Sequence, residues 1–197
     1  MNPTPSWSVI VLAGGAGRRL GGADKSTLLI DGMTTMQRLL IALPEGVPVI
    51  VAGPAQPTSR LVTFRPESPA GGGPVAGIAA ALTAVKTPNV IIVATDMPWC
   101  GPIIADLMER FARPGADALI PVTADGRRQL LCCAWRTAAL QRALDEIGDP
   151  HGRSVRDLVS LASLGEWLLD ESQSAFLGDI DTPDDLTRAQ HEPPAVP

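Results

Sequence analysis

The strongest constraint on the fold is a regular alternation of apolar runs with amphipathic segments, from the N-terminus to Phe111. The apolar runs are continuous, as expected for strands of a parallel sheet that is covered on both faces. The candidate strands are Ser8–Ala13, Val47–Ala52, Leu61–Phe64 (the weakest), Val90–Thr95, Ala118–Val122, Leu130–Trp135 and Ala175–Ile180.

The segments between these runs carry apolar residues at the spacing of one helix face, as Met33, Met36, Leu40 and Leu43 illustrate. The candidate helices are Met33–Leu43, Val75–Val85, Ile103–Phe111, Thr137–Ile147, Val155–Leu161 and Asp184–Gln190. Alternating strands and helices predict βαβ units in a doubly wound α/β sheet. The length of 197 residues fits one large domain, expected over residues 1–190, and the proline-rich end, residues 191–197, is expected to be a disordered tail.

Composition and charge narrow the function classes. The net charge is −5, there is no Tyr and there are three Phe, which argues against a nucleic-acid partner. No apolar stretch approaches the roughly 18 residues of a membrane span, and the N-terminus lacks a signal-peptide pattern. Cys100, Cys132 and Cys133 form no C-x-x-C pair, so we expect buried thiols in a reducing compartment and a cytoplasmic protein without a membrane partner.

A glycine-rich segment with basic residues directly follows the first candidate strand: LAGGAGRRLGGADK, residues 12–25. Loops after the carboxyl ends of strands form the ligand sites of open α/β sheets. Glycines let the backbone approach phosphates, and Arg18, Arg19 and Lys25 supply positive charge for them. The segment matches neither common phosphate loop, since Leu20 and Asp24 stand where a glycine is needed. It predicts a triphosphate-binding loop; a flexible turn with solvated arginines is the alternative.

Asp96 closes the buried strand in the segment VATDMP. An unpaired charge there would be costly, so we expect a cation partner, and Mg²⁺ is usually held by one or two carboxylates together with substrate phosphates. A turn or helix-capping aspartate is the alternative.

The segment DIDTPDD near the C-terminus offers further carboxylates. If the strand persists, Asp179 and Asp181 lie on one face, and either could complete the metal site with Asp96. A capping or solvated aspartate is the alternative for each of them. Thr182 and Pro183 predict a helix N-cap and first helical residue, while the two aspartates that follow suit the helix dipole and are expected to be structural.

The segment GGGPVAG, residues 71–77, leads into an alanine-rich helix. Small residues there allow either a nearby flat nucleobase or close packing of the helix on the sheet, and the segment alone favours packing. Farther along, candidates for binding an acceptor phosphate are Arg127, Arg128, Gln129, Arg153, Ser154 and Arg156. Solvated surface arginines are the alternative for each of them.

In this order, the segments resemble the molybdenum cofactor guanylyltransferases (the MobA type). The matching stretches are LAGGAGRRLGGADKSTL, GPVAGIAAAL, VATDMP and DIDTPDDL, which together span most of the chain. The resemblance implies a three-layer α/β/α, Rossmann-like nucleotidyltransferase fold with a mostly parallel sheet. It implies transfer of GMP from GTP to molybdopterin with Mg²⁺ as cofactor, release of pyrophosphate, and other molybdenum cofactor biosynthesis proteins as further partners.

By position, the resemblance also implies site residues. Those expected at the nucleotide are Leu12, Ala13, Gly14, Gly15, Arg18, Lys25, Glu67, Gly73, Gly77 and Asp96. Lys25, Asp96 and Arg19 would be catalytic, and Asp96 with Asp181 would hold the metal.

The sequence departs from the family pattern at several positions. Ala52 stands where the family often has Asn. An aspartate usually precedes the GPLAG-like segment of the family; here Glu67 is the nearest acid, and Pro66 is the alternative for the aligned position. Asp179 and Asp181 stand in place of the two asparagines of the family's terminal motif. Related cytidylyltransferases often carry aspartates in that last motif, so a CTP-dependent molybdopterin cytidylyltransferase is an alternative. Those enzymes, however, favour LAAG at the start, where this chain has LAGG. Another small nucleotidyltransferase and a non-catalytic nucleotide-binding regulator are the remaining alternatives.

Overall fold

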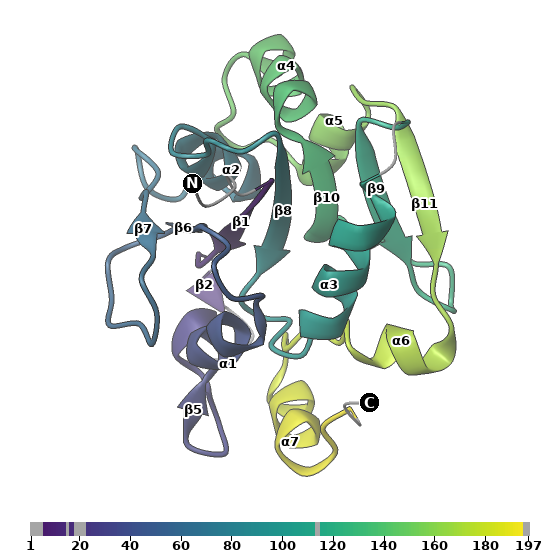
Figure 1. The fold of residues 1–197 in the computed structure, drawn as a ribbon. Coiled ribbons are helices and arrows are strands. Elements are labelled where there is room, and N and C mark those ends of the chain that lie inside the picture. Colours follow the sequence, from purple (N-terminus) through teal and green to yellow (C-terminus); the bar gives the residue numbers. More distant parts are fainter. Residues whose placement is uncertain (1–5, 15, 18–22, 113–114, 195–197) are drawn as a thin grey trace.

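The computed structural model describes residues 6–14, 16–17, 23–112 and 115–194. Its centre is a seven-stranded sheet in the order β11-β9-β10-β8-β1-β6-β7 (Figure 1). The strands are β1 (Trp7–Leu12), β6 (Val49–Ala52), β7 (Thr63–Phe64), β8 (Asn89–Ala94), β9 (Ala118–Val122), β10 (Cys132–Arg136) and β11 (Leu164–Leu168). All neighbours pair in parallel except β10, which is antiparallel to both β8 and β9. The expected mostly parallel α/β sheet is confirmed.

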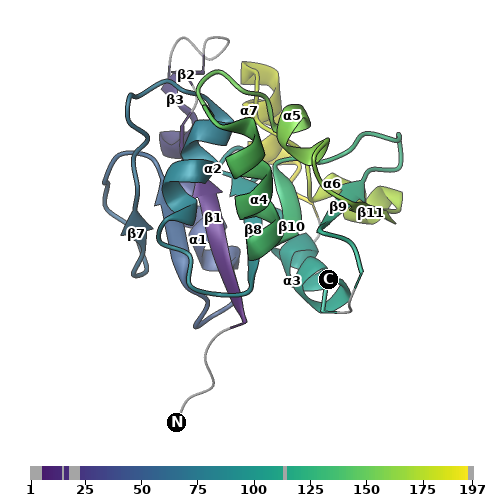
Figure 2. The same cartoon turned by 90° about the horizontal axis from the view of Figure 1, so that it is seen from above.

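Helices cover both faces of this sheet and make the three layers (Figures 1 and 2). The helices are α1 (Thr35–Ala42), α2 (Pro74–Leu82), α3 (Gly101–Arg110), α4 (Thr137–Ile147), α5 (Val155–Val159), α6 (Glu171–Ala175) and α7 (Pro183–His191). α1 and α3 pack closely on one face: a Cβ on Gly101 would lie 2.8 Å from the Cβ of Ala42. α2, α4 and α5 lie together on the other face.

The core lies at the centre of the sheet, because β1 and β8 are apolar apart from Ser8 and Asn89 and face helices on both sides. Val9, Ile10 and Val11 of β1 are fully buried, as is the stretch Val90–Val93 of β8. Cys100, Cys132 and Cys133 are buried and free, as expected. None of the described helices is long and apolar enough to cross a membrane.

Short hairpins connect β1 to α1. β2 (Ala16–Gly17) pairs with β3 (Ala23–Asp24) in antiparallel register, and a 3₁₀ turn, η2 (Lys25–Thr27), follows at once. A second hairpin, β4 (Leu29–Ile30) with β5 (Met33–Thr34), then leads into α1. Within the glycine-rich segment, the described residues 16–17 and 23–24 therefore form a hairpin that ends directly before Lys25.

The C-terminal third differs from expectation. The expected strand Ala175–Ile180 is wrong, because α6 ends at Ala175 and the residues after it form a turn and a loop. The apolar side chains of this loop, Phe176, Leu177 and Ile180, are buried. The edge of the sheet is instead β11, which was not expected. α7 continues through His191, one residue beyond the expected domain boundary, and residues 195–197 of the expected tail lie outside the described residues. The division into a domain and a tail stays a prediction.

Candidate functional site

Backbone hydrogen bonds bring the ends of β1, β6 and β8 together at one edge of the sheet. The Thr95 amide and hydroxyl both donate to the carbonyl of Leu12, at 3.2 and 3.3 Å. The Ala13 amide donates to the carbonyl of Ala52 at 2.9 Å. Gly53 is required beside them, since a Cβ there would lie 2.5 Å from the Ala13 carbonyl oxygen. The residues that follow these strands therefore share one site, as the parallel topology predicts.

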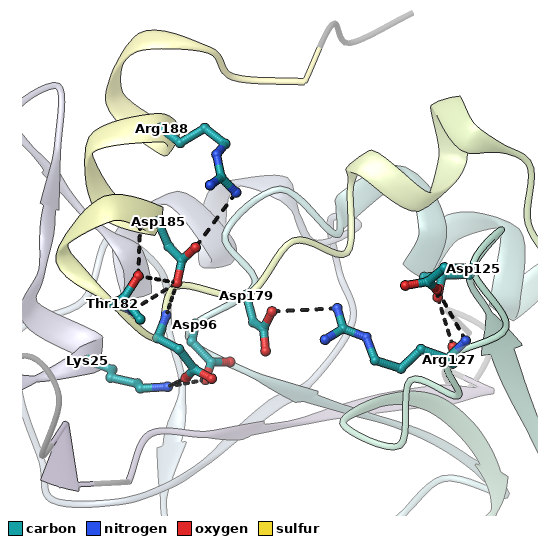
Figure 3. A network of polar contacts seen from close by, with 10 residues as sticks. Lys25, Asp96, Asp125, Arg127, Asp179, Thr182, Asp185 and Arg188 are labelled. Carbon is teal, nitrogen blue, oxygen red and sulfur yellow. Dashed lines mark hydrogen bonds and ion pairs between the residues drawn. The ribbon is translucent and has the colours of Figure 1, made fainter.

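Lys25 reaches this edge from the hairpin after β1. Its backbone carbonyl accepts a hydrogen bond from the buried Thr35 hydroxyl at 2.5 Å, which anchors η2 to the start of α1. Its ammonium Nζ donates to Asp96 Oδ2 at 2.8 Å and also to Asp181 Oδ1 (Figure 3). The two residues that the sequence singled out most strongly, Lys25 and Asp96, are thus in direct contact.

Asp181 arrives from the far end of the chain through a backbone contact. The Ile180 amide donates to the carbonyl of Asp96 at 3.0 Å, and the Ile180 side chain is buried. The next residues form the expected capping box, in which Thr182 caps α7 and Asp185 accepts from the Thr182 amide at 2.9 Å. Together these contacts fix Asp181 beside Asp96 without a strand.

The electrostatics of the cluster show an excess of negative charge. Burial raises the pKa of Asp96; the hydrogen bond and charge of Lys25 lower it, but the charges of Asp179 and Asp181 add to the rise, and the net shift is upward. Burial alone would lower the pKa of Lys25, yet its hydrogen bonds to Asp181 and Asp96 and their charges raise it overall. The Lys25 ammonium therefore stays protonated, and it is shared by two of the three aspartates, so a further cation beside them would be favoured.

Arg127 approaches the cluster from the opposite side to Lys25. It comes from the turn between β9 and β10 and pairs with Asp179 at 3.8 Å (Figure 3). Asp179 in turn lies close enough to Asp96 to raise its pKa. The three aspartates are thus flanked by one lysine and one arginine that come from different halves of the chain.

The glycines and the apolar residues expected at the nucleotide lie around the same edge. The side chains of Leu12 and Ala13 are buried, so only their backbone can meet a ligand, while a Cβ on Gly14 would meet nothing within 4 Å. A Cβ on Gly77 would lie 3.4 Å from Leu12 Cδ2 and from Ala52 Cβ, which bears out close packing of α2 on the sheet. Gly73 caps α2 with φ of 90°, a value that favours glycine.

Glu67 folds back onto the loop that precedes α2. Its Oε1 accepts a hydrogen bond from the Gly71 amide at 2.7 Å, and its Oε2 is buried without a hydrogen-bond partner among the described residues. The carboxylate thus lies against the glycines that lead into α2, with one oxygen left for a donor.

The remaining candidates are not gathered at the cluster. Gly15, Arg18 and Arg19 lie outside the described residues. Arg128 donates to Glu166 of β11 at 2.6 Å, and Arg153 and Arg156 are exposed. In the described part of the chain, no group of three or more His, Cys, Asp or Glu residues is arranged to hold a metal ion on its own. Asp96 and Asp181 could therefore hold one only together with oxygens of a ligand.

Three contributors to the site were missed from the sequence. Thr35 and Thr95 act through hydroxyl contacts to backbone carbonyls, and Ile180 acts through its amide. Thr95 could have been found from its place beside Asp96 at the end of a buried strand. The other two depend on contacts between distant segments and leave no signal in the local pattern.

Comparisons with known proteins agree with the fold. The molybdenum cofactor guanylyltransferase of Rhodobacter capsulatus is 30% identical over 92% of this chain and 93% of its own. Among solved structures, molybdopterin-guanine dinucleotide biosynthesis protein A from Archaeoglobus fulgidus superposes with a TM-score of 0.69 at 23% identity, covering 93% of this chain and 96% of that one. A 2-C-methyl-D-erythritol 4-phosphate cytidylyltransferase from Thermus thermophilus shares the fold as well, with a TM-score of 0.66 at 22% identity over 93% and 96% of the two chains.

The model of the MobA-like NTP transferase domain matches residues 9–165, which include the hairpin, Lys25, Asp96 and the turn of Arg127. The match covers well over half of the chain, and the resemblance drawn from the sequence motifs is confirmed. The chain belongs to the MobA-like NTP transferase family.

Proposed function

We propose that this protein transfers GMP from GTP to molybdopterin, forming molybdopterin guanine dinucleotide and releasing pyrophosphate. The observation that carries the proposal is the contact between Lys25 Nζ and Asp96 Oδ2 at 2.8 Å, because it unites the glycine-rich hairpin and the end of β8 in one site. Such a site offers phosphates a cation and offers a metal ion a carboxylate. The family membership and the guanylyltransferase relative supply the choice of reaction.

The reaction is an in-line displacement. An oxygen of the acceptor phosphate forms a bond to the α-phosphorus of GTP, the bond from that phosphorus to the bridging oxygen breaks, and the electron pair leaves with pyrophosphate. Such a transfer needs alignment and charge neutralisation rather than a covalent intermediate with the protein. Lys25 suits the role of a cation on the triphosphate, and the backbone of Leu12, Ala13 and Gly14 suits close approach to the nucleotide.

The residues at the site fit a divalent cation, for which we propose Mg²⁺. Burial, together with the charges of Asp179 and Asp181, raises the pKa of Asp96 despite its contact with Lys25, so a cation bound at this carboxylate would favour its ionised form. Asp96 and Asp181 would hold the ion, and GTP phosphates would complete its ligands, as is usual for Mg²⁺. When bound, the cation would neutralise developing charge on the phosphates. Lys25 would then exchange its two carboxylate partners for phosphate oxygens.

Guanine is proposed over cytosine because of the relatives and the LAGG motif after β1. The fold does not choose between the bases, since a cytidylyltransferase shares it. Glu67 is a candidate for base recognition, because its Oε2 has no hydrogen-bond partner among the described residues and could accept from an amino group. We also infer a cytoplasmic location, which the three free, buried cysteines support.

The proposal is tested by measuring pyrophosphate release and the dinucleotide product with GTP or CTP, with and without molybdopterin. We expect turnover that requires both GTP and molybdopterin. Turnover with CTP but not GTP would replace the guanylyl assignment, and GTP cleavage that ignores the acceptor would exclude the transfer. Lys25→Ala should reduce the rate at least about 100-fold. Lys86→Ala is the matched control, since Lys86 is exposed after α2 and should leave the rate unchanged.

A further inference from the structure

An acceptor phosphate faces an electrostatic obstacle at this site. Asp96, Asp179 and Asp181 lie together, and a phosphate monoester brings nearly two more negative charges. Lys25 lies on one side of the cluster, at the end of the hairpin proposed to hold the nucleotide. An acceptor that enters from the other side needs its own cation there.

Arg127 lies on that other side (Figure 3). Its backbone is held firmly: the Thr123 amide donates to the Arg127 carbonyl at 3.0 Å, and the Arg127 amide donates to Asp125 Oδ1 at 3.2 Å. Gly126, with φ of 84°, closes this tight turn. The backbone is thus anchored at the residue that carries the guanidinium.

The guanidinium itself is held only loosely. Its contact with Asp179 spans 3.8 Å, and the two side chains are 59% and 43% exposed. Exposed ion pairs of this kind contribute little to stability. The neighbouring Arg128 differs, since its Nε donates to Glu166 at 2.6 Å. Arg127 can therefore turn to an incoming anion at small cost, and a guanidinium can hold a phosphate with two parallel hydrogen bonds.

A cavity of about 420 Å³ lies beside Arg127, between its turn and α6. The Ala124 amide donates to Ser174 Oγ at 2.9 Å, so the two walls of the cavity are joined. The lining residues are Thr123, Ala124, Asp125, Arg127, Glu171 and Ser174. These walls offer hydroxyl and carboxylate acceptors, which suit the amino and ring N–H donors of a pterin.

We propose that Arg127 is the binding residue for the acceptor phosphate and that the cavity beside it receives the pterin of the acceptor. Asp179 holds the guanidinium toward the cluster when no acceptor is bound and releases it to the phosphate. This assignment rests on the proposed function for the identity of the acceptor. It assigns the two ends of the cluster to the two substrates, with Lys25 on the nucleotide side and Arg127 on the acceptor side.

The test compares Arg127→Ala, Asp179→Asn and the control Arg142→Ala in steady-state guanylyl transfer. Arg142 is an exposed arginine in the middle of α4 and pairs with Asp117 at 3.2 Å. Arg127→Ala should raise the KM for molybdopterin at least about tenfold and leave the KM for GTP within about twofold. Asp179→Asn should not raise the KM for molybdopterin, because it removes only the competing partner of Arg127. The control should match the wild type.

Two results would overturn the assignment: an unchanged KM for molybdopterin in Arg127→Ala, or an equal rise in Asp179→Asn, which would point to a structural ion pair. Anaerobic equilibrium binding of molybdopterin alone, measured by ultrafiltration, needs no turnover. If the wild type transfers no GMP, the proposed function fails. The assignment then stands if Arg127→Ala weakens this binding at least about tenfold, and it falls if binding is equal.

Discussion

Asp96→Asn separates the catalytic role of the site from its effect on stability. The Asn side chain has nearly the same volume, and the Ile180 amide still donates to the carbonyl of residue 96, so the local fold should persist. The change removes the charge proposed to hold a divalent cation. Since such a cation supplies several kcal/mol to the transition state and about 1.4 kcal/mol is tenfold in rate, we expect the rate to fall at least ~100-fold.

Although Asp96→Asn should slow the reaction, it should not destabilise the fold. Burial and the charges of Asp179 and Asp181 raise the pKa of Asp96 in the folded protein, despite Lys25. A carboxyl with a raised folded pKa stabilises the fold below its unfolded pKa and loses that contribution as pH rises. At pH 7 the ionised Asp96 therefore opposes folding of the metal-free protein. Asp96→Asn should leave the Tm unchanged or raise it by up to about 4 °C, equivalent to about 1 kcal/mol.

The competing view treats Lys25 and Asp96 as a stabilising buried ion pair. Breaking a buried pair costs about 3–5 kcal/mol, or a fall in Tm of at least about 6 °C in a protein of this size. Both side chains are 19% exposed, so this cost is an upper bound. Thermal unfolding at pH 7 in chelator, beside steady-state pyrophosphate release, distinguishes the views. Asp145→Asn on the exposed side of α4 is the control. A fall in Tm of 6 °C or more, or a rate within tenfold of wild type, refutes the reasoning.

Three further predictions concern the proposed metal ligand Asp181, the pH dependence of stability, and the close approach at Gly53. Asp181→Asn should raise the Mg²⁺ concentration for half-maximal rate about tenfold, because a carboxylate ligand loses its charge; an unchanged Mg²⁺ titration would remove Asp181 from the metal site. In urea unfolding of the metal-free protein, the free energy of unfolding of Asp96→Asn relative to wild type should increase from about pH 4 upward and then level off. The reason is that Asp96, with its raised pKa, ionises over this range and destabilises the folded wild type. A difference that stays constant from about pH 4 to 8 contradicts this sign. Gly53→Ala should lower the free energy of unfolding by about 1–3 kcal/mol and raise the KM for GTP, because its Cβ would lie 2.5 Å from the Ala13 carbonyl oxygen. The control Gly178→Ala, whose Cβ would lie 3.6 Å from the Ala175 carbonyl oxygen, should change neither quantity.

The centre of the fold was predictable because burial dominates its sequence. β1 and β8 are apolar on both faces, so the expected runs Ser8–Ala13 and Val90–Thr95 lie within a residue of the observed strands. β11 was missed because it lies at the sheet edge and pairs only with β9, with Trp167 its one buried residue. The run Ala175–Ile180 misled for the converse reason: its apolar residues are buried by loop packing, which the linear pattern does not distinguish from a strand.

The site was predictable where strand ends determine it. Asp96 comes soon after the end of β8, and Lys25 comes at the end of the hairpin that follows the neighbouring strand β1, so the two residues meet at the edge of the sheet that these strand ends share. The pairing of Asp179 with Arg127 was not predictable, although both residues were candidates, because it depends on how the β9–β10 turn and the segment after α6 fold toward each other. Nor was the antiparallel direction of β10, since an apolar run does not encode its orientation.

The central idea is that Lys25 and Asp96 form one pocket for a triphosphate and a divalent cation. A crystal structure of the protein with GTP and Mn²⁺, located by its anomalous scattering, tests this most directly. We expect the anomalous peak at the Asp96 carboxylate and the Lys25 ammonium on a phosphate oxygen. A metal bound elsewhere, or a triphosphate that leaves Lys25 on Asp96 and Asp181, would contradict it.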